Sequence, residues 1–135
     1  MKKVVIDTNI VVSAALVKEG KPARILNLIS DSDGEIQVFY SVKMMAEYKE
    51  VLSRERFHIA AKIQSGIIGA IEKSGTLINP PASDMALPDE SDRVFYDTAK
   101  ESGSVLITGN MKHYPAEEFI MTPAEYLLRM ELLLE

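Results

Sequence analysis

Short runs of apolar, often β-branched residues alternate along this chain with longer segments of helical pattern, and this alternation constrains the fold most strongly. Val4-Val5-Ile6 is typical of a strand buried on both faces of a sheet. Strands that alternate with helices form a parallel sheet with helices packed on its faces. We therefore expect an α/β fold with its chemistry at the carboxyl ends of the strands. Further strands are expected over residues 36–40, 76–78, 104–108 and 119–121.

Several of the helical segments carry end signals. Pro22 suits the first turn of a helix, Ser41 is a good N-cap, and Gly103 is a typical residue just past a helix end. Thr122-Pro123-Ala124-Glu125 has the form of a capping box with proline at the first helical position. The pattern predicts helices over residues 22–30, 42–53, 57–74 and 90–102, and a last one that starts at Pro123.

Length and composition are those of one globular domain, because 135 residues of 47% hydrophobic content suffice for one core. We expect a single domain over residues 1–135, with the proline-rich stretch 79–88 as a connection inside it. The absence of cysteine excludes thiol catalysis, zinc–thiolate sites and disulfides, and fits a reducing compartment. Asp7 comes too early for a signal peptide, and no apolar run is long enough for a membrane span. We expect a cytoplasmic protein.

The charge balance limits how the chain can bind nucleic acid. Fifteen Lys and Arg residues against twenty Asp and Glu residues give a net charge of −5. This argues against a protein that holds nucleic acid by bulk electrostatics. A local basic groove, or an acidic site that binds cations, remains compatible with the same total.

Polar residues follow the first and fourth predicted strands. Asp7-Thr8-Asn9 comes directly after Val4-Val5-Ile6, and Thr108-Gly109-Asn110 ends the strand over 104–108. Parallel strands present their carboxyl ends at one edge of the sheet, so Asn110 lies beside Asp7 if these two strands are neighbours. A structural interpretation is also open, because Asp, Thr and Asn are common helix caps and Gly-Asn is common in turns.

Two further acids lie on predicted helices. Glu47 falls at the edge of its helix's apolar stripe, where a carboxylate requires a partner, a cation or a raised pKa. An ordinary ion pair with Lys43 or Lys49 is the alternative. Asp92 continues the apolar face of the helix that follows it and so points toward the core side. A capping role at the helix N-terminus is the alternative for Asp92.

Together these positions place three carboxylates and one amide oxygen at the same end of one sheet. Clustered carboxylates repel each other unless a cation neutralises them. A ligand set made only of oxygen suits Mg²⁺ or Mn²⁺ rather than zinc or copper. Such a site activates water and binds phosphate oxygens, which is the chemistry of metal-assisted phosphodiester hydrolysis.

The same residues resemble the PIN-domain ribonucleases, named for the PilT N-terminus, and more narrowly the branch of toxin components of toxin–antitoxin systems. The resemblance covers nearly the whole chain in order. It rests on Val4-Val5-Ile6-Asp7-Thr8-Asn9, on Glu47, on Asp92 seven residues before Ala99, on Leu106-Ile107-Thr108-Gly109-Asn110, and on Lys112-His113-Tyr114-Pro115. It implies a three-layer α/β/α sandwich with strand order 3-2-1-4-5.

The resemblance also implies a metal-dependent endoribonuclease that cleaves single-stranded RNA. Its catalytic and metal-binding set is expected to be Asp7, Glu47, Asp92 and Asn110, holding one or two Mg²⁺ or Mn²⁺ ions. Many PIN nucleases have Asp where this chain has Asn110, whose amide keeps a carbonyl oxygen but lacks charge. We therefore expect lower metal affinity or a single ion. The residues expected to orient the ligands are Asn9, Thr108 and Asp97.

Substrate and partners are predicted more coarsely. We expect RNA to contact a basic patch on the helix over 42–53 and on the segment after it. The turn at 112–114 is expected to add to this contact, with Tyr114 as a stacking ring. The contact residues expected are Lys43, Arg54, Arg56, Lys112 and His113; an ordinary solvated surface is the alternative. The resemblance implies a small antitoxin partner and a homodimer. The last helix is apolar enough to contribute to a dimer contact, or to pack on its own sheet.

Two other classes of function compete with this interpretation. A haloacid-dehalogenase-type phosphatase requires Asp-x-Asp after the first strand, and Asn9 occupies the second place here. A receiver domain requires an acceptor Asp after its third strand and a late Lys, and the sequence offers no convincing pair. A non-catalytic RNA-binding or protein-binding module on a PIN scaffold remains the alternative, because Asn110 removes one charge from the site.

Overall fold

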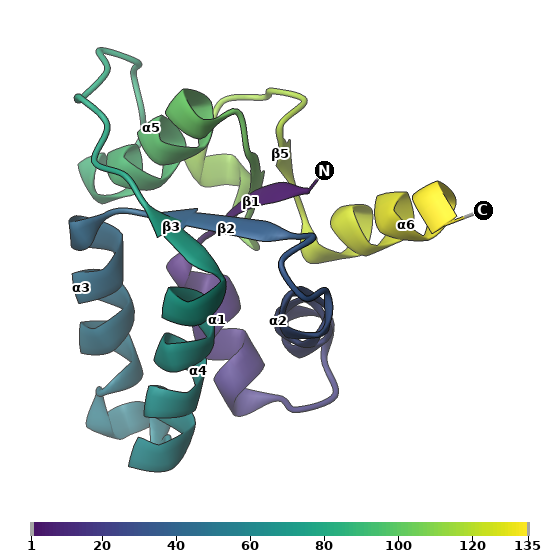
Figure 1. Ribbon diagram of the computed structural model, residues 1–135. Helices are drawn as coiled ribbons and strands as arrows, with labels where there is room; N and C mark the ends of the chain where they lie inside the picture. Colours follow the sequence, from purple (N-terminus) through teal and green to yellow (C-terminus); the bar gives the residue numbers. More distant parts are fainter. Residues whose placement is uncertain (1, 135) are drawn as a thin grey trace.

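A five-stranded parallel sheet forms the centre of the molecule (Figure 1), in a computed structural model that describes residues 2–134. The strand order is β3-β2-β1-β4-β5, which confirms the expected order 3-2-1-4-5 and the parallel sheet. The strand β1 lies at the centre of the sheet, with β2 and β3 on one side of it and β4 and β5 on the other. The strands are β1 (Lys3–Ile6), β2 (Gln37–Tyr40), β3 (Gly75–Leu77), β4 (Val105–Ile107) and β5 (Ile120–Met121).

Helices cover both faces of the sheet and complete a three-layer α/β/α arrangement (Figure 1). The helices on one face are α1 (Thr8–Leu16), α2 (Lys21–Asp31), α3 (Val42–Leu52) and α4 (Ala61–Ser74). The other face is covered by α5 (Arg93–Ser102), and α6 (Pro123–Leu134) leaves the body beside β5 and contacts α2. Short 3₁₀ turns precede α4 and α5 and follow β4: η1 (Glu55–Phe57), η2 (Glu90–Asp92) and η3 (Met111–His113).

The end signals in the sequence form the contacts that were expected of them. Ser41 Oγ accepts the Met44 N–H at 3.1 Å, and Gly103 ends α5 with a left-handed φ of 67°. The capping box at α6 is reciprocal: the Glu125 N–H donates to Thr122 Oγ1 at 3.2 Å, and the Thr122 N–H donates to the Glu125 carboxylate at 3.1 Å. Local chemistry therefore determines these helix boundaries.

Three helical segments differ from the expectation. The helix expected from residue 57 begins at Ala61, because η1 precedes it and His58 adopts a left-handed φ of 51°. The helix expected over 90–102 begins with the 3₁₀ turn η2, and α5 itself starts at Arg93. For the helix α1 no range was predicted, although the capping interpretation of Asp7-Thr8-Asn9 implies a helix start there. Its buried residues include three consecutive ones, Ile10-Val11-Val12, so it lacks the one-sided apolar pattern by which a surface helix is recognised.

The register of β1 and β4 positions the polar residues at the carboxyl edge of the sheet. Ile6 lies opposite Ile107, and the Asp7 N–H continues the ladder to the Ile107 carbonyl at 3.0 Å. Tyr48, fully buried on α3, donates its hydroxyl to the Ile6 carbonyl and so ties α3 to the end of β1. The helix that carries Glu47 is thereby held next to Asp7.

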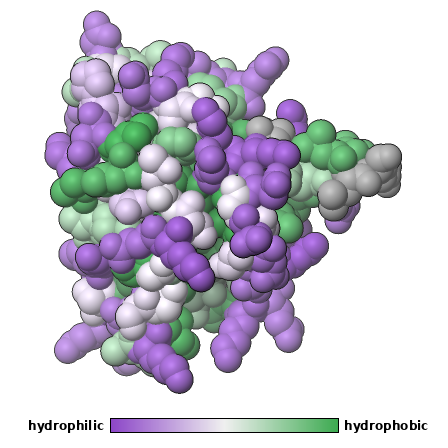
Figure 2. Space-filling view, viewed as in Figure 1, coloured by the Kyte–Doolittle hydropathy of each residue, from purple (hydrophilic) through white to green (hydrophobic). Residues whose placement is uncertain are grey.

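The helix α6 exposes an apolar face. Tyr126 is fully buried, whereas Leu128, Leu132 and Leu133 are each about three-fifths exposed. Figure 2 shows these hydrophobic residues gathered where α6 stands out from the rest of the surface. Packing on the chain's own structure, one of the two expectations for this helix, therefore accounts for only part of its apolar surface.

Candidate active site

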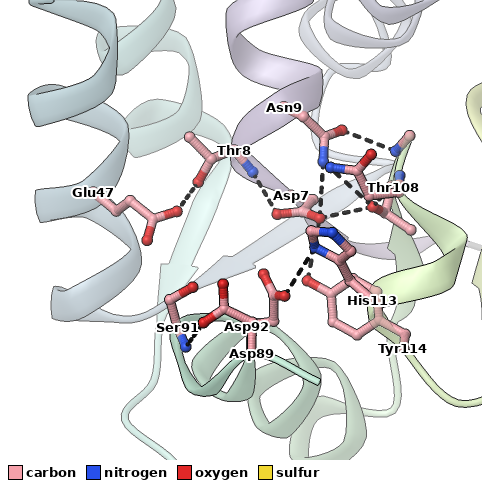
Figure 3. A network of polar contacts seen from close by, with 12 residues as sticks. Asp7, Thr8, Asn9, Glu47, Asp89, Ser91, Asp92, Thr108, His113 and Tyr114 are labelled. Carbon is pink, nitrogen blue, oxygen red and sulfur yellow. Dashed lines mark hydrogen bonds and ion pairs between the residues drawn. The ribbon is translucent and has the colours of Figure 1, made fainter. Parts of the chain in front are cut away.

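Asp7 lies at the centre of a hydrogen-bond network at the carboxyl ends of β1 and β4 (Figure 3). Its Oδ1 accepts the Thr8 N–H at 2.8 Å, which caps α1. Its Oδ2 accepts hydrogen bonds from Asn9 Nδ2 at 3.0 Å, Thr108 Oγ1 at 2.7 Å and the Tyr114 hydroxyl at 3.1 Å. Three donors use the whole capacity of Oδ2, so Oδ1 is the oxygen that retains a free lone pair. The capping interpretation of Asp7 and the site interpretation are therefore both compatible with this geometry.

Thr8 joins Asp7 to Glu47. Its backbone N–H binds Asp7, and its hydroxyl donates to Glu47 Oε2 across 39 residues of sequence. Neither Lys43 nor Lys49, the alternative partners considered for Glu47, forms an ion pair with it in the described structure. Burial raises the pKa of Glu47 and the nearby Asp7 raises it further, while the Thr8 hydrogen bond and Arg54 lower it.

Asp92 is buried at the start of α5 and faces Asp7 and Glu47 (Figure 3). Its Oδ2 lies 3.1 Å from His113 Nδ1. Burial raises the pKa of Asp92 to about 6, with a further contribution from the charge of Asp7, and His113 acts in the opposite direction. The simpler cap is Asp89, whose Oδ1 accepts the Ser91 N–H at 2.9 Å, so Asp92 is not required for capping.

Asn9 and Thr108 contact Asp7 as expected of orienting residues. Asn9 also fixes the turn after β4, since its Oδ1 accepts the Gly109 N–H at 2.9 Å. A side chain at Gly109 would bring its Cβ within 3.1 Å of that oxygen, so glycine permits this close approach. Asn110 lies next in the turn; its N–H donates to Thr108 Oγ1 at 2.9 Å, and its exposed side chain forms no described hydrogen bond with the acids.

Two residues of the network were missed by sequence reasoning. Thr8 was considered only as part of the motif Asp7-Thr8-Asn9, and nothing in the sequence indicated that its hydroxyl binds Glu47. Tyr114 was expected as a stacking ring, but it is only 6% exposed and its hydroxyl binds Asp7. The stacking prediction is therefore wrong, because the ring is packed in the core rather than presented to solvent.

The remaining predicted residues are dispersed around the site. Asp97 is buried but accepts the Ser83 N–H at 2.9 Å, and no described hydrogen bond connects it to the other acids. Arg54 binds Glu50 through two nitrogens, and Arg56 lies over the Phe57 ring. Lys43 and Lys112 are exposed and form no described ion pair. His113 is half exposed and contacts Asp92.

The acid set (Asp7, Glu47 and Asp92) fits a divalent cation by its donor chemistry. All three side chains offer carboxylate oxygens, all three are at least partly buried, and burial together with the charge of Asp7 raises the pKa values of Glu47 and Asp92. Within residues 2–134 no three acidic or histidine side chains form a ready-made metal cage. Mg²⁺ does not require such a cage, because it keeps several waters and is commonly bound through only one or two carboxylates.

Comparison with known families identifies the family of the chain. The family model described as PIN domain matches residues 3–112. The chain belongs to the PIN domain family. The match includes β1 through β4 and the first two residues of η3, and therefore every acid of the site, whereas β5 and α6 lie beyond it.

A relative of this chain is found in Methanocaldococcus jannaschii, where it is named the uncharacterized protein MJ1680. It is 32% identical over 111 residues, which are 80% of this chain and 70% of the relative. PIN domains are nucleases that hydrolyse phosphodiester bonds, and they typically depend on divalent metal ions. Among the described helices, none has the length and apolar character that a membrane crossing requires.

Proposed function

We propose that this PIN domain is a metal-dependent endoribonuclease acting on single-stranded RNA in the cytoplasm. The observation that carries the proposal is the convergence of Asp7, Glu47 and Asp92 with raised pKa values at Glu47 and Asp92. Burial and the charge of Asp7 disfavour the ionised forms of Glu47 and Asp92, and neither of these two side chains caps a helix. A bound cation offsets this cost.

Each residue of the network has a defined role in this proposal. Asp7 binds one Mg²⁺ or Mn²⁺ ion through Oδ1, with Glu47 and Asp92 as ligands either directly or through water. Asn9, Thr108 and Tyr114 fix the Asp7 carboxylate, and Thr8 sets Glu47 relative to it. When bound, the metal supplies an activated water and neutralises charge on the phosphate. Asn110 assists from the turn after β4, and the products carry a 5′-phosphate and a 3′-hydroxyl.

RNA lies across the carboxyl edge of the sheet in this proposal. Lys43 and Lys112 are exposed beside the acids and are available to phosphates. His113 and Arg54 are close enough to the acids to alter their pKa values, and Arg56 lies farther along the same segment. Because the net charge is −5, we expect weak RNA binding without metal.

We further propose that the chain acts as the toxin of a toxin–antitoxin pair and forms a homodimer. The support is the resemblance of the motifs to that branch and the exposed apolar face of α6, formed by Leu128, Leu132 and Leu133. Sedimentation of the full chain tests the dimer: a monomer at all concentrations contradicts it.

Cleavage and metal binding should be measured on the same proteins. The parent is expected to cleave single-stranded RNA in Mn²⁺, and Glu47→Gln and Asp92→Asn to reduce kcat/KM at least a hundredfold. Mn²⁺ should raise the melting temperature of the parent and much less that of the two variants. The control, Asp31→Asn, changes an exposed acid at the end of α2 and should behave as the parent. Equal cleavage by the parent and Asp92→Asn refutes the assignment.

The second candidate is a non-catalytic binding module on the same scaffold. It is favoured by the uncharged, exposed Asn110 and by the lack of a preformed three-ligand cage in residues 2–134. The melting experiment separates the two functions: no shift of the parent with Mg²⁺ or Mn²⁺ supports the binding module.

A further inference from the structure

An open cavity lies next to the acid set along the same edge of the sheet. It has a volume of about 700 Å³ and is bounded by the start of α3, the segment 79–82 after β3, and the η2–α5 segment. Glu47 forms part of its wall and so belongs both to the cavity and to the acid set. The volume is in the range of pockets that hold small organic ligands. A molecule bound at the acids therefore extends directly into this cavity.

The cavity wall offers one hydrogen-bond donor and one acceptor that the described protein does not use. Asn79 Oδ1 accepts the Val42 N–H at 3.1 Å, so its Nδ2 is the free atom, and it donates to no described group. Asp97 Oδ2 accepts the Ser83 N–H at 2.9 Å, whereas its Oδ1 is buried without a partner among the described residues. A buried carboxylate oxygen without a donor is rare and points to a missing partner.

The charges of the wall favour a neutral ligand group over an anion. The Arg93 guanidinium is already bound by Glu90 and by the Ser83 and Met85 carbonyls. The free cation among the described wall residues is Lys43, which is exposed at the rim one helical turn before Glu47 and has no described ion pair. Phosphate is therefore attracted to the rim, and an uncharged group is suited to the interior.

We propose that the cavity binds one nucleobase of the RNA strand whose phosphodiester lies at the acid set. The proposal rests on the nuclease function proposed above. Each nucleobase has an acceptor atom beside an N–H group on its edge: Asn79 Nδ2 donates to the acceptor, and Asp97 accepts from the N–H. Pro80 and Val94 supply apolar contact to the ring, and Lys43 binds a neighbouring phosphate.

Binding without metal tests the cavity separately from catalysis. The full chain is titrated in EDTA with an oligo(U) tetramer and with an abasic ribose phosphate tetramer of equal charge. We expect oligo(U) to bind at least tenfold more tightly than the abasic tetramer, because the abasic ligand leaves both wall groups unpaired. Asn79→Ala should abolish most of that preference, and Ala82→Trp, which places an indole at the cavity wall, should weaken the binding of oligo(U). Lys49→Ala on the same helix, outside the cavity, is the control for Lys43→Ala.

Hydrolysis completes the test. In Mn²⁺, Ala82→Trp should lose RNA cleavage but should hydrolyse bis(p-nitrophenyl) phosphate, which has no base, as fast as the parent. Equal binding of oligo(U) and the abasic tetramer, or unchanged RNA cleavage by Ala82→Trp, overturns the cavity proposal. Failure of the parent to hydrolyse either RNA or the small diester overturns the nuclease function instead, and the titration in EDTA still decides whether the cavity binds a base.

Discussion

Replacing Asp92 with asparagine should stabilise the folded protein at neutral pH while removing its activity. Burial and the charge of Asp7 raise the pKa of Asp92 from its ordinary value of 3.8 to about 6. The ionised carboxylate is therefore destabilising in the fold, in contrast with a carboxylate that a salt bridge stabilises. The substitution Asp92→Asn keeps the shape of the side chain and removes the charge.

The size of the effect follows from the shift. A pKa raised from 3.8 to about 6 corresponds to about 3 kcal/mol of lost folding free energy once Asp92 is ionised. The amide loses the ionic part of the contact with His113, so we expect a gain of about 1–3 kcal/mol for Asp92→Asn. For a domain of this length the melting temperature rises by roughly 3–10 °C.

The pH dependence has a definite sign. Because the folded pKa lies above the unfolded one, the folded state binds the proton more tightly between about pH 4 and pH 6. The contribution of Asp92 to the unfolding free energy therefore falls as pH rises through this window and stays constant above it. The parent and Asp92→Asn should have similar unfolding free energies near pH 4, and the whole expected difference of about 1–3 kcal/mol should be present by pH 8.

Urea unfolding of both proteins in EDTA at pH 4, 6 and 8 measures this difference. The control is Asp89→Asn in the same segment, because the pKa of Asp89 is lowered by its hydrogen bonds with Ser91, and the amide should not stabilise. Adding Mn²⁺ at pH 8 should stabilise the parent and reduce the advantage of the variant. An Asp92→Asn protein that is no more stable than the parent at pH 8 in EDTA refutes the reasoning.

Three substitutions test the supports of the site by urea unfolding. Thr108→Val should lower the unfolding free energy by about 1.5–3 kcal/mol, because it removes a buried hydrogen bond to the Asp7 carboxylate; an unchanged midpoint contradicts this. Ser41→Ala should cost about 1 kcal/mol through loss of the α3 cap, and Ser41→Asp should restore most of it. Gly75→Ala should cost about 1–3 kcal/mol, since the new Cβ would lie 2.6 Å from the Tyr40 ring; stability equal to the parent would show that β3 shifts freely.

The layers of the fold were predictable because each depends on local sequence. A few neighbouring residues are enough to predict the strand of Val4-Val5-Ile6, the cap at Ser41 and the capping box at Thr122. The helix α1 was not predictable by the same argument. Ile10, Val11 and Val12 are all buried because α1 packs between the sheet and other helices, so its sequence shows no polar face.

The positions of the acids were predictable, but the contacts that hold them were not. Asp7, Glu47 and Asp92 converge because parallel strands and the helices after them present their ends at one edge. Thr8 binds Glu47 across 39 residues and Tyr114 binds Asp7 across 107. Such contacts depend on how distant segments pack, which no local pattern encodes. The cavity beside Glu47 is formed by three segments and was missed for the same reason.

Asp7 and Asp92 carry the same charge in one site, yet the structure predicts opposite effects for the same substitution. Four donors bind the Asp7 carboxylate, one at Oδ1 and three at Oδ2. An amide has a single acceptor, so Asp7→Asn leaves either the α1 cap or the Oδ2 donors facing an N–H₂ group. We expect Asp7→Asn to lower the unfolding free energy in EDTA by about 1–3 kcal/mol, while Asp92→Asn raises it. Urea unfolding of the two variants side by side checks the contrast, and a stabilised Asp7→Asn protein would show that repulsion among the acids outweighs this hydrogen-bond network.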